Sequence, residues 1–229
     1  TAPTITNVTQ TGQTGKNFFG DSGVSMTVTG TGFKTSGTTT VKLIDPTDNS
    51  ENSATASVAS ATSLTFTVSA AMISDIQGRV GVTADDRFTL KVINPQGNGS
   101  YAKEATLLNS ASGALQYFET PTMTAAGDIS GTSSLIPATG QSYTGLTAIT
   151  ITKKDPQDTI ALSIGDNGGL AGLGISATDN GSTVTGTFTG TGADLSSVAA
   201  GTKSVRVDVV ATSDYDNQQL TTNQTYSVT

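Results

Sequence analysis

The sequence predicts an all-β protein of two consecutive β-sandwich domains. Short runs in which apolar residues alternate with Thr or Ser recur along the chain, and a period of two is typical of strands with one buried face. Thr, Ser, Gly and Val dominate, whereas helix-forming residues are scarce, which favours short strands joined by tight turns. The length of 229 residues fits two domains of about 100 residues each.

The strand that begins at Val24 is the segment around which the first domain is expected to be built. Met26 and Val28 share a side with Val24, and hydroxyl residues occupy the other side. Two glycines then permit a kink or a positive φ, so Phe33 is expected to turn back and cover the edge of the core. A second glycine-punctuated strand lies at residues 183–192, and it predicts a second domain.

The rest of the first domain has the pattern of short strands separated by turns. Asn, Asp, Pro and Gly mark turns at residues 45–49 and 94–97. One segment, residues 70–76, has the composition of a helical turn. Further strands are expected at residues 3–8, 41–44, 54–58, 64–68 and 88–93.

Four short motifs of this half belong together: Pro-Thr-Ile at residues 3–5, Val-Thr-Gly-Thr-Gly-Phe at 28–33, Ser-Leu-Thr-Phe-Thr-Val at 63–68, and Leu-Lys-Val-Ile-Asn-Pro-Gln-Gly at 90–97. With these motifs the first 100 or so residues resemble the immunoglobulin-like IPT/TIG family. The resemblance implies an immunoglobulin-like sandwich. The insertion at residues 72–86 is longer than the usual loop of that family, so the edge of the sheet is expected to be remodelled there.

The second half again has the pattern of strands and turns. Residues 205–211 give the strongest strand signal in the chain, with Val205, Val207 and Val209 on the side expected to face the core. Glycine clusters at residues 165–174 and 186–192 are expected to be turns and bulges, because no Gly-Lys-Ser/Thr follows them as in a phosphate-binding loop. Further strands are expected at residues 146–152, 159–164, 183–188 and 225–228.

Three motifs of the second half are Leu-Ser-Ile-Gly-Asp at residues 162–166, Gly-Ser-Thr-Val-Thr-Gly-Thr at 181–187, and Val-Asp-Val-Val-Ala-Thr-Ser-Asp at 207–214. With them this half resembles the cadherin-like, Ig-type repeats of bacterial and viral surface proteins. It lacks the cysteine pair and the core tryptophan of antibody domains. The resemblance implies a second immunoglobulin-like β-sandwich.

The expected domains are residues 1–108 and 119–229, with residues 109–118 as a linker or a shared strand. Residues 109–114 are small and polar, as in a linker. Charge is split unevenly between the halves. Residues 1–110 hold 7 Lys/Arg against 8 Asp/Glu, and residues 111–229 hold 4 against 10, so the net charges are −1 and −6.

The composition excludes several classes of protein. Without Cys or His, the chain has no thiol catalysis, no Ser/His/Asp triad and no typical zinc site. The net charge of −7 argues against nucleic acid as a partner. No apolar run approaches the length of about 20 residues that a membrane span needs. The chain shows no signal peptide, and Thr1 could follow either a removed Met or a cleaved signal.

Oxygen-rich turns and tyrosines are the remaining candidates for chemistry. Asp85 and Asp86, Asp155 and Asp158, and Asp214 and Asp216 are paired carboxylates, but adjacent loop acids are usually solvated, so we expect no catalytic residues, cofactor or resident metal. Calcium near Asp214 and Asp216, with Asp166-Asn167 and Asp179-Asn180 at the same end of the sandwich, stays open. So does weak carbohydrate contact through one of the tyrosines, Tyr101, Tyr117, Tyr143, Tyr215 and Tyr226.

The sequence thus predicts a non-enzymatic structural or surface-display protein. Because Ig-like domains of these families decorate phage particles, we expect a capsid decoration protein on the surface of a tailed-phage virion, bound to the protein surface of the larger assembly and not inserted in a membrane. One alternative is an extracellular module of a bacterial adhesin, pilus or S-layer. Another is an accessory carbohydrate-binding module.

Overall fold

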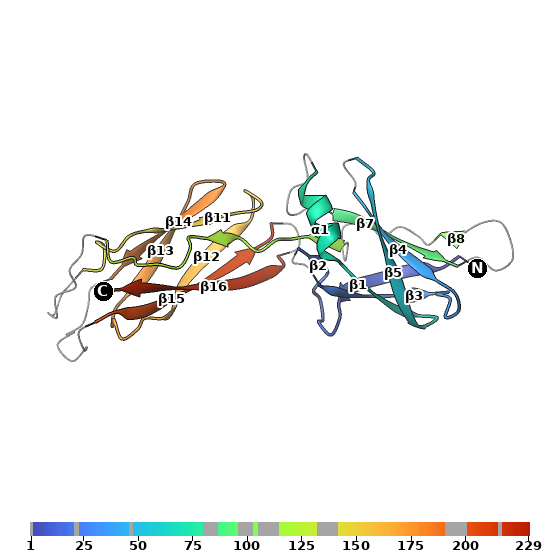
Figure 1. The fold of residues 1–229 in the computed structure, drawn as a ribbon, viewed down its shortest axis with the longest axis horizontal. Helices are drawn as coiled ribbons and strands as arrows, with labels where there is room; N and C mark the ends of the chain where they lie inside the picture. Colours follow the sequence, from blue (N-terminus) through green and yellow to red (C-terminus); the bar gives the residue numbers. More distant parts are fainter. Residues whose placement is uncertain are drawn as a thin grey trace. The chain divides into compact units, whose positions relative to one another are not determined.

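The computed structural model describes residues 2–20, 23–45, 48–79, 87–95, 103–104, 115–131, 142–190, 201–214 and 217–229. The chain divides into two compact units, Thr1–Glu119 (unit 1) and Thr120–Thr229 (unit 2). In both units the described elements are almost entirely β-strands in several sheets (Figure 1). The predicted all-β fold is therefore confirmed.

Unit 1 is built from two groups of strands that share one long strand, β5. They hydrogen-bond in the order β1-β3-β6-β5-β4-β7-β9-β2, with β8 on β7. Residues 51–56 of β5 pair with β4, and residues 57–60 pair with β6, so β5 passes from one group to the other. The bounds are β1 (Thr4–Gln10), β2 (Phe18–Phe19), β3 (Ser25–Thr31), β4 (Thr39–Ile44), β5 (Glu51–Ser60), β6 (Ser63–Thr67), β7 (Arg87–Asn94), β8 (Lys103–Glu104) and β9 (Leu115–Tyr117).

The core of unit 1 lies between these two groups of strands. Met26 and Val28 of β3 are completely buried, as their alternation predicted, and Val24 is half-buried against them. From the other group, β4 contributes Val41 and Leu43, and β7 contributes alternate large apolar residues. Apolar faces from both groups therefore close on each other and exclude water, which is the main source of stability in such a sandwich.

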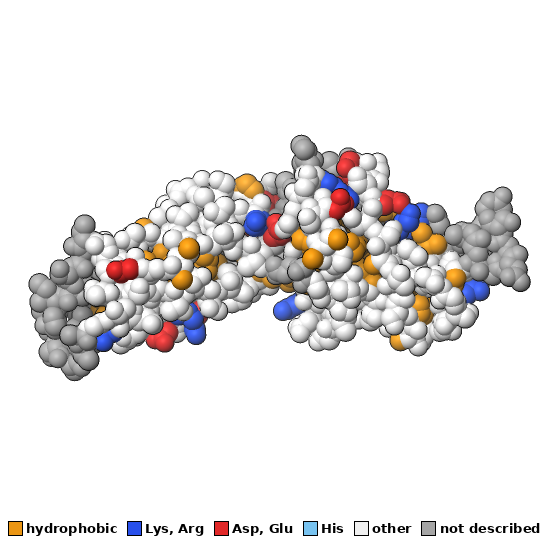
Figure 2. All heavy atoms as spheres, viewed as in Figure 1, with side chains coloured by type: hydrophobic (Ala, Val, Ile, Leu, Met, Phe, Trp, Pro, Cys, Tyr) orange, Lys and Arg blue, Asp and Glu red, His pale blue; other side chains and the backbone are white. Residues whose placement is uncertain are grey.

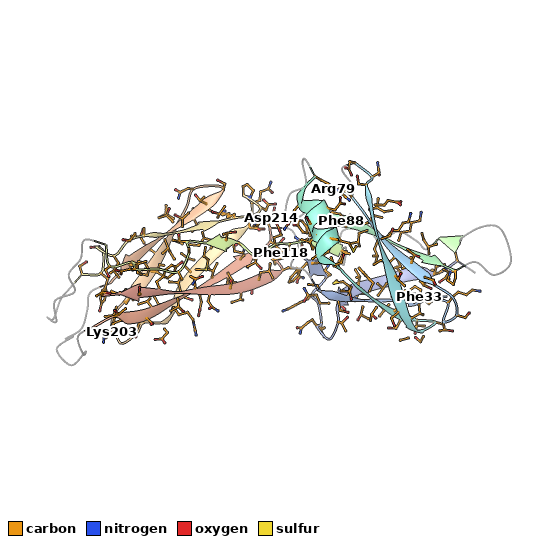
Figure 3. All side chains as sticks on the ribbon, viewed as in Figure 1. Phe33, Arg79, Phe88, Phe118, Lys203 and Asp214 are labelled. Carbon is orange, nitrogen blue, oxygen red and sulfur yellow. The ribbon has the colours of Figure 1, made fainter. Side chains whose placement is uncertain are left out.

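At the end of β3, close packing requires glycine at residue 30, and the backbone conformation favours glycine at residue 32. A Cβ atom on Gly30 would lie 1.9 Å from the carbonyl oxygen of Thr4 and 2.8 Å from the ring of Phe33. Gly32 has a φ of 75°, a left-handed conformation that glycine adopts without strain. The backbone can therefore turn and place Phe33 in the core, where it is 3% exposed. Phe33, just after β3, is labelled in Figure 3.

The helix α1 (Ala70–Gln77) begins where a helical turn was expected. The Ser69 hydroxyl accepts a hydrogen bond from the backbone N–H of Met72 at 3.2 Å and so caps the first turn. Met72, Ile73 and Ile76 are buried in the core of unit 1. The first part of the insertion at residues 72–86 is thus packed inward, and residues 80–86 lie outside the described part. Within the described residues, no helix has the length and apolar character of a membrane span.

The segment expected as a linker or shared strand belongs to unit 1 as far as it is described. Residues 115–117 form β9, which pairs antiparallel with β7 and parallel with β2. Phe118 is fully buried and its ring lies 5.4 Å from that of Phe18, edge to face. Tyr117 packs against Phe19 and Phe88. The chain therefore leaves unit 1 only after Phe118, since an aromatic cluster holds the preceding residues; residues 109–114 lie outside the description.

This position of β9 leads to a prediction about truncation. Residues 1–119 and 120–229, expressed separately, are each expected to give a β-rich circular dichroism spectrum and a cooperative thermal melt, since each has its own core. A fragment ending at residue 110 lacks β9 and two members of the aromatic cluster, Tyr117 and Phe118, and it is expected to melt at a lower temperature than residues 1–119. Equal melting temperatures for the two unit 1 fragments would contradict the role assigned to β9.

Unit 2 is formed by two separate sheets. One has the order β10-β11-β14-β13 and the other the order β12-β15-β16, all with antiparallel pairing. A parallel bridge between Asp128 and Ser227 adds an early segment to the edge of β16. The bounds are β10 (Thr122–Met123), β11 (Ile149–Thr152), β12 (Thr159–Asp166), β13 (Gly174–Asp179), β14 (Thr183–Thr189), β15 (Lys203–Thr212) and β16 (Gln219–Val228).

The core of unit 2 lies between its two sheets. Val205, Val207 and Val209 are all completely buried, as the alternation in β15 predicted. Gly186 of β14 faces the same core from the other sheet. A Cβ atom there would lie 2.9 Å from both the Ile149 and the Leu162 side chains, so glycine leaves the space that these larger residues fill.

Candidate functional site

The paired carboxylates Asp155 and Asp158 lie in the loop between β11 and β12 of unit 2, and both are buried. Asp155 Oδ1 accepts a hydrogen bond from the backbone N–H of Gln157 at 2.6 Å. Lys153, at the start of the same loop, is 2% exposed at its side chain. Its ammonium donates to the carbonyl oxygen of Pro156 at 3.0 Å. These groups hold the loop in shape, because buried polar atoms need such partners.

Lys153 also joins this loop to the turn after β13. Its ammonium nitrogen lies 2.7 Å from the carboxylate of Asp179, which is itself half exposed. This hydrogen bond holds the pKa of Asp179 below its ordinary value of 3.8, and the N–H of Gly181 lowers that pKa further. Asp179 therefore stays ionised at neutral pH and acts as the counter-ion of a buried lysine.

The calcium hypothesis placed Asp166 and Asp179 at the same end of unit 2 as Asp214, and for Asp166 this is wrong. Asp166 pairs with Arg206, whereas Thr159 at the other end of β12 pairs with Thr212, just before Asp214. Figure 3 shows Asp214 and Lys203 at opposite ends of the β15–β16 hairpin. Among the described residues no group of three acidic side chains could hold a metal ion. Asp216, Asp85 and Asp86 lie outside the description.

A charged network in unit 1 was not predicted. Arg79, just after α1, donates to Asn52 on β5 at 2.6 Å and to Asp75 on α1 at 2.5 Å. Its other terminal nitrogen lies 3.4 Å from Asp45, whose carboxylate is almost completely buried at the end of β4. The pKa of Asp75 is lowered, first by the hydrogen bond from Asn52 and then by Arg79. One guanidinium thus ties the helix to β5 and to the end of β4; Figure 3 labels Arg79 beside α1.

The described tyrosines are not available to stack on a sugar. Tyr117, Tyr143 and Tyr226 are at most 2% exposed, and all seven phenylalanines are also buried. The hydroxyl of Tyr143 donates to the carbonyl of Ala171 at 2.8 Å, and that of Tyr226 donates to the carbonyl of Thr124 at 2.9 Å. The rings of these three tyrosines are part of the hydrophobic cores. Tyr101 and Tyr215 lie outside the described residues.

Burial raises the pKa of Tyr143 and of Tyr226 above 10.0, the ordinary value. In alkali the unfolded chain loses these protons before the folded chain does, so ionisation favours unfolding. We therefore expect the free energy of unfolding of unit 2 to fall as the pH rises above 10.0, with a smaller fall in Tyr226→Phe. Urea unfolding at neutral and alkaline pH measures this fall in the wild type and in the variant. Identical pH dependence in Tyr226→Phe, Tyr143→Phe and wild type would contradict this expectation.

The outer face of the β1-β3-β6 sheet of unit 1 carries no ionisable side chain, and we call it the hydroxyl face. Neighbouring side chains on it hydrogen-bond to one another: the hydroxyls of Thr4 and Thr31 lie 2.7 Å apart, and that of Thr11, beside the face, lies 3.0 Å from those of Ser25 and Thr27. Cross-strand Thr pairs of this kind stabilise sheets. The face consists of Thr4, Thr6, Asn7, Thr9, Ser25, Thr27, Thr29, Thr31, Ser63, Thr65 and Thr67.

The β10-β11-β14-β13 sheet of unit 2 has an uncharged outer face of the same composition. The Thr124 hydroxyl accepts from the Thr150 N–H at 2.8 Å, and the Ser176 hydroxyl donates to the Thr187 carbonyl at 3.3 Å. The remaining outward positions on β10, β11, β13 and β14 are again threonines, apart from a glycine. They are Thr122, Thr152, Thr178, Thr183, Thr185, Thr189 and Gly174.

Charge is found instead on the opposite sheet of each unit. In unit 1, Lys42 of β4 lies directly across from Lys91 of β7 and forms an ion pair with Glu51. In unit 2, Arg206 and Asp208 of β15 form an ion pair with a distance of 2.8 Å. Figure 2 shows charged side chains as isolated groups on a surface that is otherwise mostly uncharged. Each unit thus has one charged and one uncharged outer face.

No protein-family model matches the chain, and no curated protein sequence is significantly similar to it. One similar solved structure is a tetra-tandem repeat in the extending region of a large adhesion protein, with 16% identity and a TM-score of 0.29. The match covers 100% of this chain and 50% of that one, so the chain spans half the length of that structure. A match at this level identifies no family.

Proposed function

We propose that this chain is a non-enzymatic module for surface display, made of two immunoglobulin-like sandwiches, which attaches through unit 1 to a repeating protein surface. The observation that carries the proposal is the hydroxyl face of unit 1. A docked surface must lose its water, and an uncharged face whose hydroxyls already bond to each other loses it at small cost.

The strand order supports the immunoglobulin-like assignment. Numbered along unit 2, its strands form the sheets 1-2-5-4 and 3-6-7. This is the arrangement of a constant-type immunoglobulin domain. In unit 1, the two groups of strands, β1-β3-β6 and β4-β7-β9, follow the same strand order, and β5 joins them.

Charge supports the choice of unit 1 as the docked unit. With the boundary at Glu119, residues 1–119 hold 7 Lys/Arg and 9 Asp/Glu, and residues 120–229 hold 4 and 9, so the net charges are −2 and −5. The more acidic unit is better suited to face solvent, because net charge favours solubility. The setting we propose is a tailed-phage capsid, as the family resemblance implies; a bacterial cell surface is the alternative.

The experiment adds purified protein to capsids that lack decoration and measures the bound copies per particle. The expected result is saturation at a fixed stoichiometry, with residues 1–119 competing for the same sites. Competition by residues 120–229 instead would reverse the orientation, and saturable binding to bacterial cells with none to capsids would favour the cell surface. Turnover of a polysaccharide or peptide by the purified chain would contradict the non-enzymatic assignment.

A matched pair of substitutions tests the face itself. Thr29→Glu places a charge at an exposed position of the hydroxyl face, and Thr150→Glu does the same on the uncharged face of unit 2. Both positions are exposed, so both variants are expected to fold. Thr29→Glu is expected to weaken the binding affinity by about tenfold, equivalent to about 1.4 kcal/mol, and Thr150→Glu to leave it unchanged. Equal effects would contradict attachment through unit 1.

A further inference from the structure

Two turns of unit 2 have the same sequence, Asp-Asn-Gly, and the same carboxylate contact. Asp166-Asn167-Gly168 begins at the last residue of β12, and Asp179-Asn180-Gly181 begins at the last residue of β13. In both turns the aspartate Oδ1 accepts a hydrogen bond from the glycine N–H two residues later, at 2.9 Å. The backbone nitrogen after each asparagine therefore has a carboxylate beside its proton.

The two asparagine side chains are held in different ways. Asn167 Oδ1 accepts a hydrogen bond from the Gly169 N–H at 2.9 Å, so its carbonyl is folded over the peptide of Gly168. Asn180 instead uses its amide nitrogen, which donates to the Thr178 carbonyl at 3.3 Å and to the Thr185 hydroxyl at 3.1 Å. The carbonyl of Asn167 is thus polarised by a donor, whereas the amide of Asn180 is held towards its own strand pair.

From this difference we infer that Asn167 is a site of spontaneous covalent modification, at which the side-chain amide becomes a carboxylate through a cyclic imide. Asp166 and Gly169 lie where the reaction needs a proton acceptor and an oxyanion donor. A base must lie within about 2.6–3.2 Å of the proton that it accepts, and Asp166 meets this condition. This inference is independent of the proposed function.

The reaction balances with water as its only co-reactant. The Gly168 N–H gives its proton towards Asp166, and the nitrogen attacks Cγ of Asn167 to form a new C–N bond. The Gly169 N–H stabilises the negative oxygen of the tetrahedral intermediate. The bond from Cγ to Nδ2 then breaks, and ammonia leaves with the transferred proton. Water opens the five-membered imide to aspartate or isoaspartate. No atom is oxidised or reduced.

The test compares the two asparagines within one protein sample. Full-length protein is incubated in mildly alkaline buffer, and peptide mapping by mass spectrometry follows the mass gain of amide-to-acid conversion at each site. Asn167 is expected to convert about tenfold faster than Asn180, since one oriented oxyanion donor contributes at least that much in acyl transfer. In urea, where both turns are unfolded, the two rates are expected to be similar because glycine follows both.

Asp166→Asn provides the matched variant, since the amide oxygen can still accept the Gly168 N–H bond but is a much weaker base. It is expected to slow conversion of Asn167 and leave Asn180 unchanged. Gly168→Ala is unsuitable, because its Cβ would lie 2.5 Å from the Ser204 carbonyl oxygen. Equal native rates at the two asparagines would overturn the inference, and so would an unchanged or faster rate at Asn167 in folded Asp166→Asn.

Discussion

Val28→Asp is expected to unfold unit 1 or to lower its free energy of unfolding by about 4 kcal/mol, because the substitution buries an unpaired charge. Val28 is completely buried and sits opposite Val8 on one side and Leu64 on the other. Since a domain has only about 5–15 kcal/mol of stability, the loss is a large share. Chemical denaturation of residues 1–119 measures it directly.

Thr29→Asp is the control for Val28→Asp, because the neighbouring side chain lies on the exposed hydroxyl face. The same charge there stays hydrated and is expected to change stability by about 0.5 kcal/mol or less. Comparable losses in the two variants would mean that β3 does not present alternate faces to core and solvent.

Arg79→Met is expected to destabilise unit 1 by about 3 kcal/mol, because it removes the guanidinium beside a buried carboxylate, and breaking a buried ion pair is strongly destabilising. The charge is that of Asp45, whose side chain is 1% exposed. The substitution also removes the hydrogen bonds to Asn52 and Asp75. The denaturation midpoint of residues 1–119 gives the measurement, and α1 is the element expected to loosen.

The matched control is Asp75→Asn, which removes the exposed carboxylate bound by the same guanidinium. Asp75 is 56% exposed at its side chain, and exposed ion pairs contribute at most about 1 kcal/mol. We therefore expect a small effect. If Asp75→Asn is as damaging as Arg79→Met, the buried Asp45 is not what makes the arginine important.

Alternation was enough to predict the strands whose inward side chains are large. Met26 and Val28 in β3, and the valines of β15, have this pattern, and each lies where it was expected. β13 was not predicted, because among its inward positions only Ile175 is large. Its place is determined by its hairpin pairing with β14 across a three-residue turn, and alternation within a single strand does not contain that pairing.

The candidate site was less predictable, because its parts come from different strands. The threonines of β1, β3 and β6 are visible in the sequence, but the register that lines them up as one uncharged face is not. The same applies to Arg79 and Asp45, which are far apart along the chain and meet where the residue just after the end of α1 reaches the end of β4. The sequence alone left open whether a tyrosine lies on the surface and contacts a carbohydrate. Tyr117, Tyr143 and Tyr226 are instead buried in the cores.

Parallel pairing near the ends of each unit has a mechanical consequence. In unit 2, the Ser227 N–H donates to Gly127 and the Ile129 N–H donates to Ser227, at 2.8 and 2.9 Å. In unit 1, Phe118 donates to Phe19 at 2.7 Å. Tension that reaches such a pair from the two termini pulls its strands lengthwise past each other, so the bonds bear load together in shear. An antiparallel hairpin pulled at its open end unzips one bond at a time and resists less.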